Sequence, residues 1–419
     1  MKEINKIKVS YNGKVVGSII RYQRYLTAFA YDPEWLRNGF SISPFSLPLR
    51  EEPFIAKQEP FDGLFGVFAD SLPDGWGRLL LDRLLLKNKI NPHSVGNLER
   101  LAIVGASGMG ALSYEPEYNI SEKSGFADLD KLAEECSLIL SSEYNDNIDE
   151  LFSLGGSSGG ARPKILTKVD GEDWIIKFPA SMDKPDIGLQ EYKYSLCARK
   201  CGISMSETHL FPSARCEGYF GTKRFDRVKT SEGEKRIHMV SVSALLETSH
   251  RIPNLDYVIL GKLTLTLTKD YQELEKLFRL MCFNVFAHNR DDHSKNFSFI
   301  YSDDEKKWIL SPAYDLTYSY SIGGEHATTV DGNGKNPGMK DIMEVAKKLG
   351  MNLKLAEDIA QQVRVCVEDD LGEILSKRKK QMPTIGSWYR RLQAKAQDNK
   401  NSDYQFHYSC LLYTSPSPR

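Results

Sequence analysis

The sequence predicts a mixed α+β protein in three parts: a small amino-terminal α/β domain, a lobe built on β-strands, and a mostly helical carboxyl-terminal lobe. Three observations predict this order. Short alternating stretches open the chain, a glycine-rich stretch runs into a β-hairpin, and a strongly apolar helix precedes a very polar loop. We expect a first domain over 1–118, a helical connector over 119–150 and a second domain over 151–400.

The composition is that of an ordinary globular protein, with 41% hydrophobic and 26% charged residues. The 55 Lys and Arg residues nearly cancel the 56 Asp and Glu residues, so charge alone does not suggest that the bulk of the chain binds nucleic acid. The amino terminus lacks the apolar core of a signal peptide, and no apolar run is long enough to span a bilayer. We therefore expect a cytoplasmic protein with no membrane partner.

The cysteines form no CxxC pair and no His/Cys cluster with the spacing of metal ligands. This pattern favours reduced thiols and argues against a disulfide framework or a zinc site. The seven cysteines stand at positions 136, 197, 201, 216, 282, 366 and 410.

The last ten residues, 410–419 (CLLYTSPSPR), follow a polar helical tail abruptly. They look like translated read-through of a sequencing adapter, in which case the natural carboxyl terminus has been replaced. A short disordered native tail is the alternative, and neither interpretation assigns chemistry to this segment.

The first domain is predicted from strands at 5–22 and 26–31, with Asn12-Gly13 as a hairpin turn. A helical pattern follows and is broken at Pro73-Asp74-Gly75. The stretch GASGMGALSYEP, 105–116, imitates a nucleotide-binding loop, but it lacks the Lys-Ser/Thr that would follow and leads into a strand, so we interpret it as tight turns. An acidic helical segment, 128–151, leads to the second domain.

The stretch GGSSGGARPKIL, 155–166, is compatible with a phosphate cradle or with a flexible linker. After it, KILTKV and DWIIKFP form a predicted hairpin whose second strand carries Lys177, and a helix at 189–200 has Glu191 in its first turn. In kinase-like folds this order of elements assembles an ATP site, where the lysine holds phosphates and the glutamate orients the lysine. A snorkelling edge-strand lysine and a helix-dipole carboxylate are the structural alternatives.

Residues 270–286 form a predicted buried helix with an Asp/Glu capping box, and they lead into the polar sequence AHNRDDHSKNFSFIY. We expect a strand from Asn296 that turns at SDDEKK and returns as WILSPAYD, which brings Asp315 back beside Asn296. Oxygen ligands that converge in this way suit Mg²⁺ supplemented by substrate phosphates. In protein kinases, Arg-Asp, four residues and Asn are followed by a second Asp; here Arg290-Asp291, Asn296 and Asp315 repeat that spacing.

On these motifs the chain resembles the HipA family of bacterial serine/threonine-kinase toxins, the kinase half of type II toxin–antitoxin modules. The resemblance covers nearly the whole chain and implies a HipA-like kinase fold, with ATP and Mg²⁺ as cofactors. The stretches that carry it are GMGALSYEP, GGSSGGARPK, WIIKFP, KRFDR, DDHSKNFS and SPAYD.

The resemblance implies a role for each matching residue. Asp291 would position the substrate hydroxyl or accept its proton, and Asn296 and Asp315 would hold magnesium. Lys223 and Phe225 would lie at the hinge that meets adenine. The other implied nucleotide-binding residues are Lys177 with its orienting partner Glu191, the loop residues Ser158, Gly159, Gly160, Ala161 and Lys164, and the loop residues His293 and Lys295.

In the family, a serine of the glycine-rich loop is phosphorylated by the kinase itself, which disables nucleotide binding. The matching serine is Ser157, although Ser158 is adjacent and leaves the modified residue open between the two. Toxin members phosphorylate translation proteins, aminoacyl-tRNA synthetases among them. A helix-turn-helix antitoxin of the HipB type inhibits the family's toxins and contacts most of the operator DNA, which fits the near-neutral charge.

Three other functions remain open at this point. The chain could phosphorylate a small-molecule alcohol, since the chemistry asks only for a positioned hydroxyl, metal and phosphates. It could be a catalytically weak co-repressor, which the retained Lys177, Asp291, Asn296 and Asp315 argue against. A structural or interaction protein would not need such a polar loop. A small upstream helix-turn-helix gene would favour the toxin–antitoxin interpretation.

Overall fold

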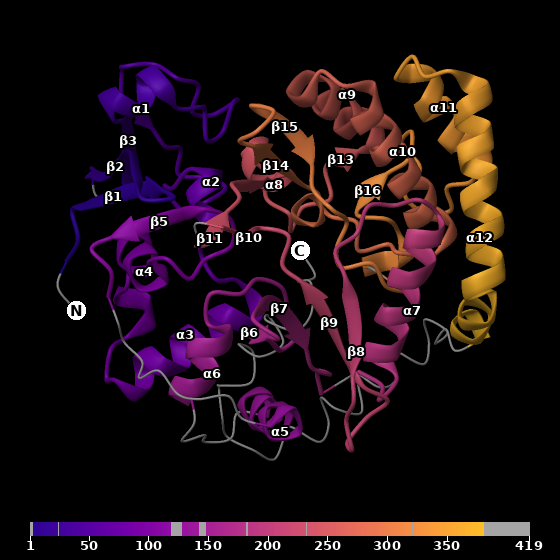
Figure 1. The fold of residues 1–419 in the computed structure, drawn as a ribbon, viewed down its shortest axis with the longest axis horizontal. Coiled ribbons are helices and arrows are strands. Elements are labelled where there is room, and N and C mark those ends of the chain that lie inside the picture. The colour runs from indigo at the N-terminus through magenta and orange to yellow at the C-terminus, as the bar shows by residue number, and fades with distance from the viewer. Residues whose placement is uncertain are drawn as a thin grey trace.

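The computed structural model describes residues 3–23, 25–118, 128–141, 148–181, 183–231, 233–320 and 322–380 (Figure 1). The predicted read-through segment 410–419 therefore lies outside the described residues. Within the described part, no helix combines the length and the apolar character that a bilayer crossing requires.

The amino-terminal segment forms an antiparallel sheet of five strands in the order β4-β3-β2-β1-β5. The predicted hairpin is confirmed: Asn12 and Gly13 join β1 to β2 with φ of 44° and 80°, the left-handed conformation that such turns require. The stretch after Gly105 leads into a strand, as expected. The strands are β1 Lys6–Tyr11, β2 Lys14–Tyr22, β3 Leu26–Tyr31, β4 Phe54–Ile55 and β5 Leu112–Glu115.

Helices α1 and α4 pack against this sheet, whereas α3 lies beside α6 (Figure 1). The predicted break in the helical pattern is confirmed, because α2 ends at Ala69 and α3 begins at Gly75. The elements are α1 Pro33–Asn38, α2 Gly66–Ala69, α3 Gly75–Lys87, η1 Pro92–Ser94 and α4 Asn97–Val104. The connector contributes α5 Leu129–Leu140 and α6 Ile148–Gly155.

A second antiparallel sheet has the strand order β6-β7-β9-β8, and α7 packs against β8 and β9. The predicted hairpin is again confirmed: β6 pairs with β7 through a turn at Asp170 and Gly171. The helix α7 begins two residues earlier than expected. The elements are β6 Lys164–Val169, β7 Glu172–Lys177, α7 Ile187–Lys200, β8 Thr208–Phe211 and β9 Tyr219–Lys223.

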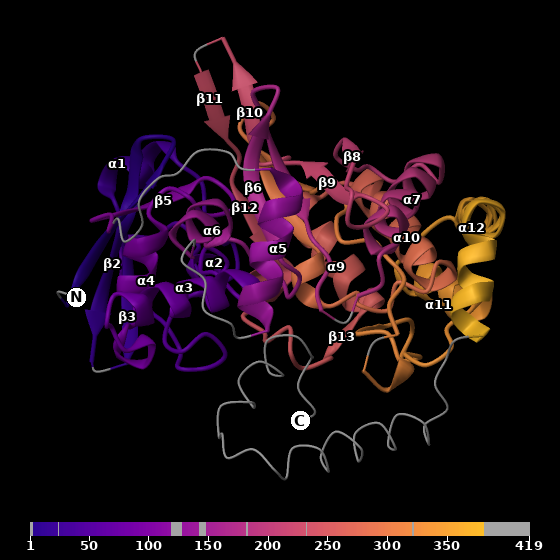
Figure 2. The same cartoon turned by 90° about the horizontal axis from the view of Figure 1, so that it is seen from below.

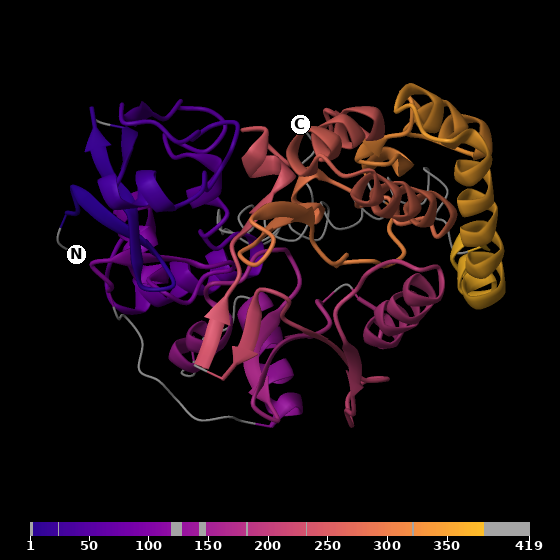
Figure 3. The same cartoon turned by 45° about the horizontal axis from the view of Figure 1, so that its top comes forward.

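A third sheet, β12-β14-β15, lies between the amino-terminal sheet and the carboxyl-terminal helices (Figure 3). Earlier in the sequence than this sheet, β10 and β11 form a separate hairpin that projects from the body of the molecule (Figure 2). The elements are β10 Arg227–Thr230, β11 Gly233–Arg236, β12 Met239–Ser241, α8 Val242–Leu245, η2 Ser294–Asn296, β14 Ser298–Ser302 and β15 Lys307–Leu310.

The carboxyl-terminal lobe is mostly helical, as predicted, with α10 between α9 and α12 (Figure 1). Asp270 caps α10 by accepting from the amide of Gln272. The expected capping box is incomplete, because the Glu273 carboxylate does not bind the amide of Asp270. It accepts from the amide of Leu310 at 2.8 Å and so connects the helix to β15. The remaining elements are β13 Leu255–Asp256, α9 Tyr257–Thr268, α10 Tyr271–Phe286, η3 Ile322–Gly324, β16 Thr328–Thr329, α11 Met339–Lys348 and α12 Leu353–Lys380.

The hydrophobic cores extend across the expected domain boundary at residue 118. One continuous core runs from the amino-terminal sheet through α7 and α10 to α12. A second core joins α3, from the first segment, to α5, α6 and the sheet that contains β7; Trp76 and Leu80 of α3 are buried in it. The amino-terminal segment is therefore packed against both of the other parts.

A buried cluster of charges reinforces this junction. Asp226 is fully buried and accepts from Arg224, from Arg227 and from the amide of Gly110. Burial raises the pKa of Asp226, but attraction to Arg224 and Arg227 outweighs it and holds the pKa below its ordinary value. The Gly110 carbonyl in turn accepts from Arg236 and Arg227. The glycine-rich turn predicted as structural thus connects the first segment to β10 and β11.

We predict that Asp226→Ala destabilises the protein by about 3–5 kcal/mol, because it leaves two buried guanidinium groups without their counter-charge. Asp358→Ala is the matched control, since it removes an exposed i,i+4 partner of Lys354 and should cost less than about 1 kcal/mol. Chemical denaturation followed by circular dichroism measures both. Equal midpoints for the two variants would show that the cluster contributes nothing to the junction.

Candidate active site

The centre of the candidate site is the ammonium group of Lys177, at the end of β7. It donates to Glu191 Oε1 at 2.5 Å and to the Asp315 carboxylate, and it lies 5.5 Å from the centre of the Phe220 ring. The Lys177 side chain is 10% exposed and that of Glu191 4% exposed. Three distant parts of the sequence therefore meet at one nitrogen atom.

Nearby opposite charges determine the ionisation states of Lys177 and Asp315. Burial lowers the pKa of Lys177, but attraction to Asp315 and Glu191 outweighs burial and raises the pKa above its ordinary value. Burial likewise raises the pKa of Asp315, and attraction to Lys177, Lys164 and Arg162 more than reverses this and lowers it. Lys177 is therefore cationic and Asp315 anionic at neutral pH.

The two structural alternatives for this pair are wrong. Strand β7 lies between β6 and β9, so Lys177 is not on an edge strand. Glu191 is in the second turn of α7, because the helix begins at Ile187, and its buried carboxylate binds Lys177 and not the helix amino terminus.

The glycine-rich loop is held against the start of α3. Asp74 Oδ1 accepts from the amide of Gly160 at 2.5 Å, and the Gly160 carbonyl accepts from the amide of Trp76 at 2.9 Å. A Cβ on Gly75 would lie 2.3 Å from that carbonyl oxygen, so only glycine permits the approach. Lys164 Nζ donates to the Gly159 carbonyl at 2.6 Å. A loop with these contacts is not a free linker.

The loop surface is open to solvent over part of its length. Gly159, Gly160 and Ala161 are exposed. Ser157 is half-buried, and its hydroxyl donates to the Ser107 carbonyl at 3.0 Å. Ser158 is only 2% exposed, and its hydroxyl donates to the Gly155 carbonyl at 2.6 Å. The two adjacent serines thus have different surroundings.

The polar loop after α10 presents Asp291 to solvent, with 58% of its side chain exposed. The backbone carbonyl of Asp291 accepts from Asn296 Nδ2 at 2.6 Å, and His293 Nε2 lies 3.9 Å from Asp291 Oδ1. The strand that we expected to begin at Asn296 begins at Ser298, so the prediction was wrong by two residues. His293 Nδ1 accepts from the amide of Lys295 and closes the 3₁₀ turn η2, which keeps Asn296 out of β14.

Asp292, which the sequence did not single out, anchors this loop. It is 1% exposed and accepts from Tyr257 at 2.8 Å, from the amide of Thr328 at 3.1 Å and lies 2.9 Å from His326 Nδ1. Buried Asp292 thus points inward and exposed Asp291 points outward. Asp292 therefore holds the loop in place, and the neighbouring Asp291 remains accessible from solvent.

Lys295 is bound by an acidic residue from the first segment. Its ammonium contacts the Asp74 carboxylate. Burial lowers the pKa of Lys295, and attraction to Asp74 and Asp70 outweighs this and raises it. Asp74 follows a proline and precedes Gly75 at the start of a helix, which is the position of an N-cap. The Asp74 side chain makes no capping hydrogen bond, so the N-cap signal in the sequence does not predict its contacts with Gly160 and Lys295.

The neighbouring histidines differ in their surroundings. The His293 ring lies 5.4 Å from the ring of His250. Burial, together with the positive charge of Lys295, lowers the pKa of His250 to about 3, so this ring is neutral at pH 7. His250 was not expected near the site.

The segment after β15 returns beside this loop, as expected. The Tyr314 hydroxyl donates to the Lys295 carbonyl at 2.7 Å, and its oxygen lies 2.5 Å from Ser298 Oγ. Asp315 follows, with a φ of 55° that turns its side chain toward Lys177. Asn296 and Asp315 have different hydrogen-bond partners, the Asp291 carbonyl and the Lys177 ammonium.

The donor chemistry of these two side chains fits a hard divalent cation. The Asn296 amide nitrogen is engaged with Asp291, which leaves its oxygen as the ligand atom, and Asp315 supplies an ionised carboxylate. Both predicted hinge residues are half-buried. Lys223 Nζ pairs with Glu172 at 3.0 Å, and the Phe225 ring lies 6.0 Å from the Tyr314 ring at 31°.

Comparisons with known proteins agree with this architecture. The HipA N-terminal domain family matches residues 7–115 and the HipA-like C-terminal domain family matches residues 156–371. Two proteins of Sinorhizobium fredii are similar: Putative kinase Y4mE, 26% identical over 75% of this chain and 77% of that protein, and Putative kinase Y4dM, 26% identical over 46% and 50%.

A solved structure shares the fold. It is the HipA of Shewanella oneidensis MR-1, in a complex with HipB and operator DNA, with a TM-score of 0.66 and 15% identity over 90% of this chain and 92% of that one. The two family matches together span most of the chain, the fold is a HipA-like kinase fold, and the chain therefore belongs to the HipA family.

Proposed function

We propose that this chain is an ATP- and Mg²⁺-dependent serine/threonine protein kinase, the toxin of a HipA-type toxin–antitoxin module. The observation that carries the proposal is the Lys177 ammonium held by Glu191 and Asp315. A structural lysine needs one counter-charge, whereas a kinase site needs a lysine for phosphates, a glutamate that orients it and an aspartate for metal. All three meet here.

Each residue has a role in this proposal. Lys177 binds phosphate oxygens of ATP while Glu191 holds its ammonium in place. The exposed loop residues Gly159, Gly160 and Ala161 cover the phosphates, and the Gly160 amide would have to leave Asp74 to bind them. Lys164, Lys295 and His293 add positive charge or hydrogen bonds nearby, and Lys223 and Phe225 border the base. Ser158 is buried within the loop, where its hydroxyl donates to the Gly155 carbonyl and supports the shape of the loop.

Asn296 and Asp315 hold Mg²⁺ in the proposed site. The metal ion supplies charge neutralisation on the transferred phosphoryl group. Lys177 then exchanges its contact with Asp315 for the phosphates, and Glu191 remains as the fixed partner.

Asp291 orients the attacking hydroxyl and accepts its proton. Its exposed carboxylate suits a substrate that approaches from solvent, as a serine or threonine side chain of another protein does. The family resemblance suggests translation proteins, such as aminoacyl-tRNA synthetases, as the acceptor. The similar HipA structure contains HipB and operator DNA, which supports a HipB-like helix-turn-helix antitoxin as partner and DNA contact mainly through it.

We predict that Asp291→Asn lowers phosphoryl transfer by about 100-fold or more while ATP still binds, because only the proton acceptor is lost. Asp304→Asn, at an exposed position in the β14–β15 turn, is the matched control and should retain full activity. Transfer of labelled phosphate from ATP to the chain and to a generic serine-containing protein measures both. Full activity in Asp291→Asn would exclude this residue as the base.

Asp315→Ala and Asn296→Ala should each raise the Mg²⁺ concentration needed for half-maximal activity, because each removes one oxygen ligand. Circular dichroism should be unchanged. Activity titrated against Mg²⁺ at fixed ATP tests this. An unaltered Mg²⁺ requirement in both variants would contradict the metal assignment.

We also propose that the chain phosphorylates itself on Ser157. The half-buried Ser157 hydroxyl holds the loop to Ser107, and a phosphate would break that contact and add about 1.5–2 negative charges beside the ATP phosphates. Purified active protein should carry phosphate on the peptide that contains GGSSGGAR, and Asp291→Asn protein should not. Fragmentation by mass spectrometry locates it, and phosphate on Ser158 alone would move the assignment by one residue.

Ser157→Asp should lower nucleotide affinity, measured by titration with ATP. Ser153→Asp, at an exposed position on α6, is the matched control that adds the same charge outside the loop. Equal affinities in the two variants would remove the regulatory role of Ser157.

A further inference from the structure

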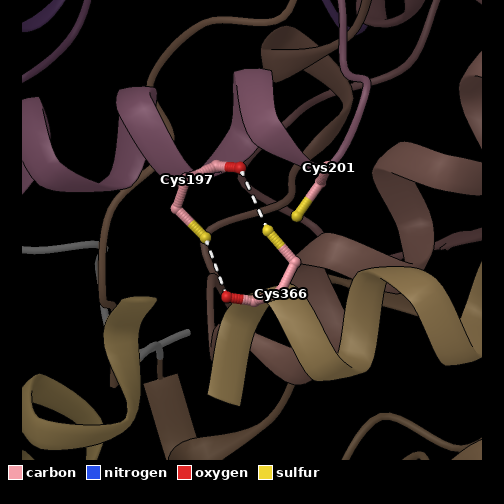
Figure 4. A group of neighbouring side chains, drawn as sticks. All are labelled: Cys197, Cys201 and Cys366. Atoms are coloured by element: carbon pink, nitrogen blue, oxygen red, sulfur yellow. Dashed lines mark hydrogen bonds between the residues drawn. The ribbon is translucent and has the colours of Figure 1, made fainter. Parts of the chain in front are cut away.

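Three cysteines meet at the packing contact between α7 and α12. Cys197 and Cys201 are one helical turn apart at the end of α7, and Cys366 comes from α12 (Figure 4). Their sulfur atoms all lie within 4.8 Å of one another. Among the described residues, this is the group of three or more His, Cys, Asp or Glu side chains whose ligand atoms are close enough to share one metal ion. The spacing argument from sequence overlooked it, because Cys366 is remote along the chain.

The sulfur positions suit a metal ion better than a packing role. Three sulfurs bound to one ion at about 2.3 Å lie about 4 Å apart, so a contraction of less than about 1 Å would complete the site. The present contacts that hold the thiols are weak. Cys197 Sγ and Cys366 Sγ each donate to the other residue's carbonyl, at 3.7 and 3.9 Å (Figure 4). Cys201 Sγ donates to the Val363 carbonyl at 4.0 Å.

The surroundings select the kind of ion. Cys197 and Cys201 are fully buried in the main hydrophobic core, and Cys366 is half-buried. Thiolates in an apolar environment favour soft d¹⁰ cations over Mg²⁺ or Ca²⁺, which prefer oxygen. The ion also supplies the positive charge that buried thiolates require.

We propose that Cys197, Cys201 and Cys366 form a three-thiolate site for a thiophilic d¹⁰ cation, Zn²⁺ or Cu⁺, which ties α12 to α7. Binding replaces three S–H bonds by three S–metal bonds and releases three protons to solvent. Because α7 also carries Glu191, the ion fixes the helix that orients Lys177; this consequence rests on the proposed kinase function.

The test uses the full chain with Cys410→Ser, which removes the one cysteine outside the described residues, in reduced and metal-free form. Titration with Co²⁺, the spectroscopic substitute for Zn²⁺, should produce thiolate-to-metal charge-transfer absorption that saturates at one ion per chain. A parallel titration with Cu⁺ against a chromophoric chelator tests the second ion. At a 100-fold excess over Kd, the bound ion should raise the melting temperature by about 3–5 °C. Failure of both ions to bind would overturn the proposal.

Cys366→Ser and Cys201→Ser should lose the absorption and the thermal shift, and Cys216→Ser, at a half-buried thiol outside the cluster, should keep both. Equal loss in Cys216→Ser would overturn the assignment. If a cluster variant does not fold, alkylation of the unsubstituted cluster decides. Metal should protect the peptide of Cys366, the half-buried member of the cluster, and leave Cys216 reactive, and unchanged reactivity of Cys366 would overturn the site. None of these measurements depends on kinase activity.

Discussion

The architecture of the site depends on one buried cation, the ammonium of Lys177. An ammonium group cannot stay charged in a low-dielectric interior without nearby anions, so its position requires Glu191 and Asp315 to be in place together. Those carboxylates come from α7 and from the segment after β15. Correct placement of one nitrogen atom therefore requires correct docking of the strand lobe on the helical lobe.

A second ion pair couples the first segment to the same centre. Asp74, at the start of α3, binds both the Gly160 amide of the glycine-rich loop and the Lys295 ammonium of the polar loop. Burial raises the pKa of Asp74, but Lys295 outweighs it and lowers the pKa. The two loops expected to handle phosphates are thus held by one carboxylate that belongs to neither. Any movement of the glycine-rich loop has to break that contact.

Local sequence signals predicted the local structure well. The hairpin turns at Asn12-Gly13 and Asp170-Gly171 and the apolar face of α10 follow from neighbouring residues, so they were predictable. Asp74, His250 and the Asp226 cluster were not, because their partners lie far away in sequence and pair only after folding. Glu273 illustrates the difference: its position indicated a capping box, but the amide of Leu310 offered a better partner. The roles of Asp291, Asn296 and Asp315 came from spacing and family resemblance, and they stay predictions.

The continuous core has a consequence for how such chains can be recombined. Side chains of the amino-terminal sheet pack in the same apolar cluster as α10 and α12, and Trp76 of α3 packs in the same cluster as β6 and β7. A chimera that joined the first 118 residues to the remainder of a distant relative would bring together surfaces shaped for other neighbours. Exchange of that segment alone should yield an insoluble hybrid, because its side chains are shaped for these neighbours.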